Sequence, residues 1–209
     1  MKVAILIPVN ETVKAVTAQC LARMVSRTYL AKLAGPAGSI SPIVETFIWS
    51  SSSIAYNRRR LVLLALEWGA DYVLWVDGDM TFPPDGLLRL LAHGKAVVGT
   101  NYRRRNVESV LPTAARTRAG ERSAMMPSGA GLKEADHIGL GFCLIEARVL
   151  RALKMPMFLE GVGPDGLSPT GEDVHFFERV REAGFAVHVD DDLSMEIGHM
   201  AETPLYFPR

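Results

Sequence analysis

Two continuous apolar runs, separated by segments of helical pattern, constrain the fold of this chain most strongly. Lys2–Val9 (KVAILIPV) and Tyr72–Val76 (YVLWV) are almost wholly apolar and rich in β-branched residues. Strands without polar alternation are typical of parallel sheets, because helices cover both faces of such a sheet. The two runs therefore predict neighbouring strands inside a layered α/β protein.

The first hundred residues alternate between strand and helix patterns. Further strands are expected over 43–49 and 96–100, and apolar residues recur at helical spacing over 11–33, 57–68 and 85–93. Pro83-Pro84 precedes the third of these helices, and Gly94 follows it. This β-α-β-α-β order predicts an open, mostly parallel, doubly wound sheet of Rossmann-like type.

The second half of the chain is less regular. From Arg103 to Asp136 the periodicity fades into Arg, Gly, Ser and Pro, which predicts an irregular excursion or a hairpin with a functional role. Strand, helix, loop, helix and strand patterns then follow over 137–145, 146–154, 155–169, 170–184 and 185–189, before an acidic tail that we expect to be irregular. We expect one domain over 1–209, with halves 1–102 and 137–209 on either side of the excursion 103–136.

The composition excludes several classes of protein. The 23 basic residues balance the 23 acidic ones, so no overall field attracts nucleic acid or anionic membrane. The apolar N-terminus lacks a small-residue cleavage site, and Leu61–Leu66 is far too short to span a bilayer. Cys20 and Cys143 lie in apolar contexts and are expected to be buried thiols. We expect a cytoplasmic protein without membrane insertion.

Asp77-Gly78-Asp79 directly follows the strand pattern YVLWV. Ligands of open α/β sheets bind beyond the carboxyl ends of the strands, and two carboxylates placed there repel each other unless a cation lies between them. Oxygen ligands suit Mg²⁺ or Mn²⁺, which keep positions for phosphate oxygens and water. A simple turn is the alternative, because Asp and Gly favour turns after strands.

Four segments in this order resemble one enzyme family: GADYVLWVDGDMTFPPDGLLRLL, VVGTNY, IGLGFCLIEARVLRAL and GEDVHFFERVREAGFAVHVD. Together they resemble the GT-A glycosyltransferases, particularly the family 2-like branch. The resemblance implies a GT-A-type sheet with a C-terminal subregion facing the acceptor. It also implies a nucleoside diphosphate sugar as donor substrate and a divalent metal, Mn²⁺ or Mg²⁺, as cofactor.

The resemblance also implies roles for individual residues. Asp77 and Asp79 match the DxD motif of the family, and His199 matches a late histidine that completes the metal site in some members. Asp173 matches the general base of inverting members, and the neighbouring Glu172 is expected to support acceptor binding. Contacts to the donor nucleotide or its sugar are implied for Pro8, Val9, Asn10, Asp77, Gly78, Gly139 and Gly141.

Several polar residues have a structural interpretation beside the functional one. Thr170 can cap the helix that contains Asp173, and the helix dipole then favours the ionised carboxylate. Arg103–Arg105 can grip phosphate or form a solvated face. Asn57 or Arg58 can face the nucleotide. Asp190–Asp192 is expected to be a solvated charge run.

These patterns predict a metal-dependent glycosyltransferase that moves a sugar onto an acceptor hydroxyl. The acceptor stays open among a saccharide, a small molecule and a modified DNA base. One alternative is a sugar-nucleotide nucleotidyltransferase, but Val9–Thr12 lacks the Gly-rich, Lys-bearing loop that such an enzyme needs. A non-catalytic module that binds nucleotide sugars is the other alternative.

Overall fold

A seven-stranded mixed sheet forms the centre of the molecule. The computed structural model describes residues 1–35, 38–105, 110–118, 121–162, 167, 169–201 and 204–205. The strand order is β10-β14-β7-β11-β5-β1-β4. Five strands run in one direction, and β10 and β11 run against them, so the predicted open, mostly parallel α/β sheet is confirmed. The bounds of the seven strands are β1 Lys2–Val9, β4 Ile43–Ser50, β5 Tyr72–Val76, β7 Val97–Gly99, β10 Leu132–Ala135, β11 Phe142–Glu146 and β14 Val187–Asp190.

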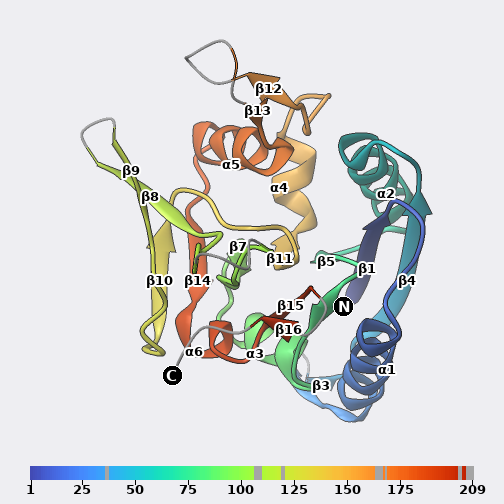
Figure 1. The fold of residues 1–209 in the computed structure, drawn as a ribbon. Coiled ribbons are helices and arrows are strands. Elements are labelled where there is room, and N and C mark those ends of the chain that lie inside the picture. The colour runs from blue at the N-terminus through green and yellow to red at the C-terminus, as the bar shows by residue number, and fades with distance from the viewer. Residues whose placement is uncertain are drawn as a thin grey trace.

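Helices cover both faces of this sheet (Figure 1). α2, α4 and α5 contribute buried residues to one core cluster, and α1, α3 and α6 contribute to the other. Their bounds are α1 Ala15–Leu30, α2 Ile54–Trp68, α3 Gly86–Ala92, α4 Ala147–Ala152, α5 Glu172–Glu182 and α6 Asp191–Ser194. None of the helices in the described part of the chain combines the length and apolar character needed to cross a membrane.

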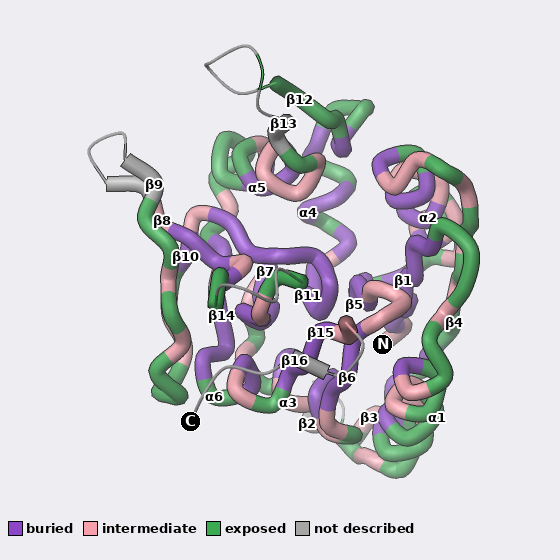
Figure 2. Tube along the Cα trace, viewed as in Figure 1, coloured by how far each residue is buried: buried purple, intermediate pink, exposed green. Residues whose placement is uncertain are grey.

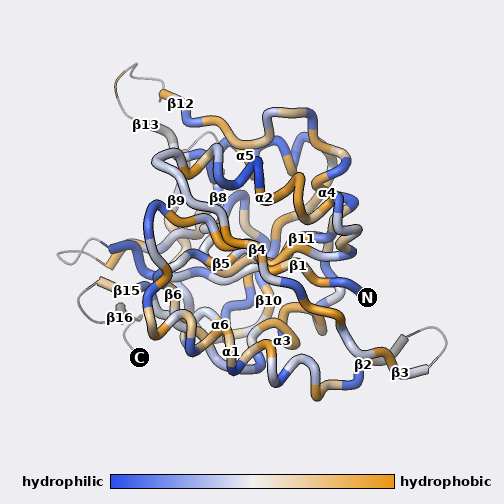
Figure 3. Tube along the Cα trace, turned by 90° about the vertical axis from the view of Figure 1, so that its right-hand side faces the viewer, coloured by the Kyte–Doolittle hydropathy of each residue, from blue (hydrophilic) through white to orange (hydrophobic). Residues whose placement is uncertain are grey.

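The two-sided covering explains why the central strands lack polar alternation. In β1, Ala4 and Leu6 pack into the cluster beneath α2, whereas Val3, Ile5 and Ile7 pack into the cluster beneath α1. The central strands are accordingly buried along their length, and exposed residues lie on the outer helices and on the edge strand β4 (Figure 2). Hydropathy follows the same pattern, with apolar residues along β1, β5 and β11 (Figure 3). Cys143 is buried as expected, while Cys20 is only half-buried.

Two predicted helix starts were wrong, each for a local reason. α1 begins at Ala15 rather than Glu11, because the chain first crosses the sheet edge, where the Lys14 amide donates to the Gly78 carbonyl over 2.7 Å. α2 begins at Ile54 rather than Asn57, because the Ser53 side chain caps the helix by accepting a hydrogen bond from the Tyr56 amide.

The excursion contains a hairpin, one of its two predicted forms. β8 (Ala115–Arg118) pairs with β9 (Glu121–Ala124), and the chain then adds β10 antiparallel to β14 at the sheet edge. The acidic tail is regular rather than irregular, since it forms α6 and then β15 (Gly198–Met200). The remaining short strands are β2 Leu33–Gly35, β3 Gly38–Ile40, β6 Met80–Thr81, β12 Gly161–Val162, β13 Pro169–Thr170 and β16 Pro204–Leu205.

The acidic run is solvated, as the sequence suggested, only at Asp192, which is exposed. Asp190 and Asp191 are buried. The carboxylate of Asp190 accepts a hydrogen bond from the Leu193 amide and so caps α6. Asp191 accepts hydrogen bonds from the Ser128 amide and from Lys133 Nζ, so it ties the excursion to the core.

The burial of one face of α2 predicts that two of its leucines contribute differently to the free energy of unfolding. Leu61 is fully buried, and Leu63 is 44% exposed. We expect Leu61→Ala to lower the free energy of unfolding by about 2–5 kcal/mol, because the lost side chain leaves a cavity. Leu63→Ala, the same change in the same helix, should stay within about 0.5 kcal/mol. Urea denaturation measures both, and equal losses would contradict this assignment of the buried face.

Candidate active site

A cavity of about 610 Å³ opens at the carboxyl edge of the parallel strands. β1, β5 and β7 run in the same direction, so the segments that follow them meet at this edge. The segment before β11 reaches the same edge, because β11 runs in the opposite direction. Ten residues singled out in the sequence line the cavity: Pro8, Val9, Asn10, Arg58, Asp77, Gly78, Asp79, Arg105, Glu172 and Asp173.

The turn Asp77-Gly78-Asp79 is held tightly against its neighbours. The Asp77 amide donates to the Gly141 carbonyl over 3.1 Å. A Cβ on Gly78 would lie 2.8 Å from Cγ1 of Val9, so only glycine allows the end of β1 to approach this closely. The simple turn and the ligand site, which were alternatives in the sequence, are therefore compatible, since the turn places both carboxylates at the cavity.

The Arg58 guanidinium bridges two of the carboxylates at the cavity. Nη2 lies 3.1 Å from Oδ1 of Asp77, and Nε lies 3.0 Å from Oε1 of Glu172. Burial raises the pKa of Asp77, and the Arg58 charge opposes this rise. Arg58, one of the two residues expected to face the nucleotide, lines the cavity, and two of its nitrogens bind carboxylates of the protein. Asn57 is buried and donates to the Val9 carbonyl, so it supports the wall of the cavity.

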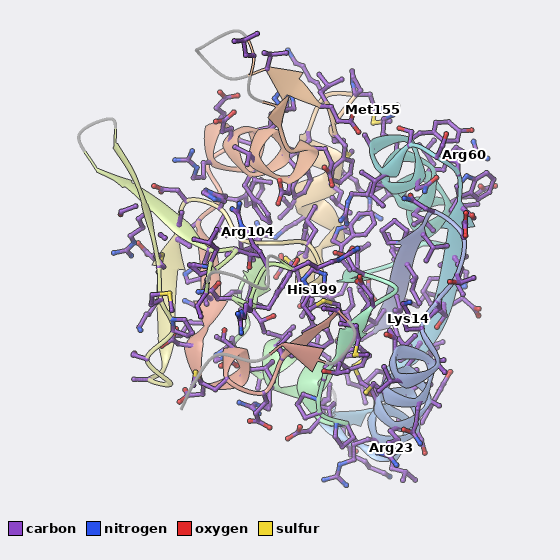
Figure 4. The ribbon with its side chains drawn as sticks, in the orientation of Figure 1. Lys14, Arg23, Arg60, Arg104, Met155 and His199 are labelled. Carbon is purple, nitrogen blue, oxygen red and sulfur yellow. The ribbon has the colours of Figure 1, made fainter. Side chains whose placement is uncertain are left out.

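Asp79 lies beside His199. β15 pairs with β6 and sets His199 opposite Met80, and the Met200 amide donates to the Asp79 carbonyl over 2.8 Å. Nε2 of His199 lies 3.5 Å from Oδ2 of Asp79. Burial acts to raise the pKa of Asp79, but its interactions with His199 and Arg105 outweigh burial, and the pKa lies below its ordinary value. Figure 4 shows His199 near the centre of the molecule.

Asp79 and His199 fit a divalent cation as a pair. Nδ1 of His199 contacts the Arg103 carbonyl at 3.1 Å, which favours the tautomer in which Nε2 carries a lone pair and can bind a metal ion. Oδ1 of Asp79 is buried and has no hydrogen-bond partner among the described residues. Water or ligand oxygens would complete the coordination of such an ion.

The predicted three-residue set Asp77, Asp79 and His199 is not assembled. Within the described ranges, no three His, Cys, Asp or Glu side chains are grouped closely enough to hold a metal ion. Asp77 is set apart from the other two because its carboxylate pairs with Arg58. Asp77 therefore forms an ion pair with the buried Arg58 guanidinium and is not a ligand of the proposed metal ion.

Asp173 lies in the first turn of α5. The predicted cap Thr170 was wrong, because Gly171 occupies the N-cap position. A Cβ on Gly171 would lie 2.6 Å from Oδ1 of Asp173, so a larger residue there would displace this carboxylate. Burial raises the pKa of Asp173, and the neighbouring Glu172 charge adds to the rise. A carboxylate with a raised pKa is the stronger base.

Tyr102 is the main site residue that the sequence analysis missed. It is buried and lines the cavity, and its hydroxyl oxygen accepts a hydrogen bond from the Gly141 amide over 2.8 Å. Gly139 and Gly141, predicted to contact the donor, make room for its ring, because a Cβ on either would lie within 2.6 Å of the phenol oxygen. Leu140 between them lines the cavity. The available signal was VVGTNY, in which Tyr102 lies three residues beyond the end of a strand.

Two basic residues, Lys14 and Arg105, also line the cavity, together with Glu11, Thr12 and Ile54. Lys14 was not singled out in the sequence, whereas phosphate binding and a solvated face were the two alternatives for Arg105. Lys14 follows the end of β1, and Arg105 is the last residue of the run Arg103–Arg105. Figure 4 shows Lys14 on the α1 side of the molecule and Arg104 on the excursion side.

Two solved structures have a similar fold. The crystal structure of A197 from STIV matches with a TM-score of 0.57 and 18% identity, over 96% of this chain and 86% of that one. The crystal structure of GalNAc-T7 with UDP, GalNAc and Mn²⁺ matches with a TM-score of 0.57 and 10% identity, over 96% of this chain and 44% of that one. No protein-family model and no curated protein matches the sequence.

The chain thus has a GT-A-like glycosyltransferase fold, as the order of its motifs predicted. It spans less than half the length of GalNAc-T7, and the likeness concerns the fold.

The buried position of Arg58 predicts a pH-dependent loss of stability on its removal. We expect Arg58→Met to lower the free energy of unfolding by about 3–5 kcal/mol at neutral pH, because Asp77 and Glu172 lose their counter-ion. The pKa of Asp77, already raised by burial, rises further in the folded variant. The loss should therefore shrink as the pH falls through this pKa and the carboxyl becomes protonated.

Urea denaturation at neutral and mildly acidic pH measures the effect. Arg23→Met, on the exposed face of α1, is the matched control and should change stability by no more than about 0.5 kcal/mol at either pH. A loss for Arg58→Met that does not change with pH would contradict the counter-ion role.

Proposed function

We propose that this protein is a glycosyltransferase that moves a sugar from a nucleoside diphosphate sugar to an acceptor hydroxyl with the help of Mn²⁺ or Mg²⁺. One observation carries the proposal: Asp77, Asp79, Glu172 and Asp173 line a single cavity at the carboxyl edge of a GT-A-like sheet. GalNAc-T7, which has a similar fold, was crystallised with UDP, GalNAc and Mn²⁺, which supports this class of donor.

The two predicted halves of the domain meet at this cavity. Residues 1–102 contribute the end of β1, the start of α2 and the turn after β5, and these form the donor side. Residues 137–209 contribute Leu140 and the start of α5, and these form the acceptor side. The excursion 103–136 provides Arg105 at the mouth, where it contributes to donor and acceptor choice.

The donor lies along the end of β1. Pro8, Val9 and Asn10 form the wall for the base and ribose, together with Gly78. Asp79 and His199 would hold the metal ion, which would stabilise the negative charge that develops on the departing diphosphate. Lys14 adds a positive charge on the same wall for the phosphates.

Asp173 removes the proton from the acceptor hydroxyl as that oxygen attacks the anomeric carbon. Its raised pKa strengthens the carboxylate as a base. Glu172 is held by Arg58 at 3.0 Å, so it positions the start of α5 and offers its remaining oxygen to the acceptor. The pairing with Arg58 leaves Asp173 as the carboxylate of this turn that takes the proton.

Asp79→Asn tests the metal site. We expect UDP at about one hundred times its Kd to stabilise the wild-type protein by about 2.7 kcal/mol in the presence of Mn²⁺, and the Mn²⁺-dependent part of this gain to vanish in the variant. Asp71→Asn, at the opposite edge of the sheet, should behave as wild type. Thermal unfolding with UDP, with and without Mn²⁺, provides the measurement, and a retained Mn²⁺-dependent gain would rule out Asp79 as a ligand.

Asp173→Asn tests the base. We expect donor binding to persist and the rate of sugar transfer to fall by about 10²–10⁴-fold, because the amide cannot accept the proton. Release of nucleoside diphosphate from a panel of sugar nucleotides, with candidate acceptors, measures the rate. Glu178→Gln, exposed on the same helix, is the matched control. A near-normal rate in Asp173→Asn would remove the base assignment, and binding without any turnover in the wild type would indicate a non-catalytic module.

A further inference from the structure

The Arg105 guanidinium occupies the space between the two proposed metal ligands. Nη2 of Arg105 lies 2.6 Å from Oδ2 of Asp79. Nε of the same side chain donates to Nε2 of His199 over 3.0 Å. One edge of the guanidinium therefore engages both groups that a cation would need, and it does so with its two fixed donors.

A metal ion and Arg105 cannot use these atoms together. Coordination needs the lone pair of His199 Nε2, which accepts the hydrogen bond from Arg105. It also needs Oδ2 of Asp79 or the orphaned Oδ1 beside it, within reach of the same positive charge. Binding of a divalent cation thus requires the guanidinium to leave.

The two arginines of the site differ in how readily they can leave. The Arg58 side chain is 5% exposed and held by two carboxylates, so its displacement would strand a buried charge. The Arg105 side chain is 65% exposed, so a displaced guanidinium returns to water at little cost. Arg105 is therefore the exchangeable cation of the cavity, whereas Arg58 is a fixed one.

We propose that Arg105 is an internal cation that holds the metal site closed until metal and diphosphate arrive together. In the absence of metal, Arg105 neutralises Asp79 and orients His199. When metal binds, the guanidinium leaves both ligands and pairs with the diphosphate oxygens at the mouth of the cavity, for which its planar donors are suited. This proposal rests on the proposed function and deepens it, because it makes metal and nucleotide binding cooperative through one side chain.

Calorimetric titration with Mn²⁺ alone tests the exchange without any reading of activity. We expect Arg105→Ala to bind Mn²⁺ about threefold to tenfold more tightly than wild type, because no guanidinium competes for Asp79 and His199. Arg105→Lys, which keeps the charge but lacks the two-donor edge, should fall between the two. Arg104→Ala, which removes the same charge from the neighbouring residue, should match wild type, since its Nε donates to the Pro112 carbonyl.

The same titration in the presence of UDP tests the coupling. UDP should tighten Mn²⁺ binding by a larger factor in wild type than in Arg105→Ala, because only the wild-type guanidinium gains a phosphate partner on leaving. Equal Mn²⁺ affinity in wild type, Arg105→Ala and Arg104→Ala would overturn the exchange and leave the metal site intact. Failure of all variants to bind Mn²⁺, with or without UDP, would overturn both the exchange and the metal-dependent function.

Discussion

The buried ion pairs of Arg58 hold the site together. Carboxylates from the end of β5 and the start of α5 repel each other when they are brought out of water. A guanidinium between them attracts both, and this attraction offsets their repulsion. Arg58 is placed for this purpose by α2, which packs on β1 and β4. The part of the cavity wall formed by Asp77 and Glu172 therefore depends on one side chain, which contacts residues from both halves of the chain.

The sequence predicted the parts of the fold that local pattern encodes. β1 and β5 were predicted to the residue, because a strand buried on both faces leaves an unbroken apolar run. The cap at Ser53 was missed because serine is common in loops, and only its side-chain bond to the Tyr56 amide marks the helix start. β10 was missed because an edge strand needs apolar residues on one face only, and LKEA offers little pattern.

The site was predictable to the extent that its residues follow strand ends. Asp77 and Asp79 could be placed at the cavity because the edge of a parallel sheet collects whatever follows its strands. The hydrogen-bond and ion-pair partners of the site residues could not be predicted from the sequence. Arg58 and Glu172 are separated by 114 positions, and Arg105 and His199 by 94, and no spacing rule covers such pairs. The roles of Gly139 and Gly141 beneath the Tyr102 ring likewise follow only from packing.

The place of β11 in the sheet has a consequence for how the chain acquires its structure during synthesis. β7 does not touch β5; β11 lies between them and bonds to both. A ribosome that has released the first hundred residues thus leaves one side of β5 unpaired until residue 146 has emerged. An unpaired strand of this apolar character invites intermolecular pairing, so the growing chain passes through an interval of exposure to aggregation.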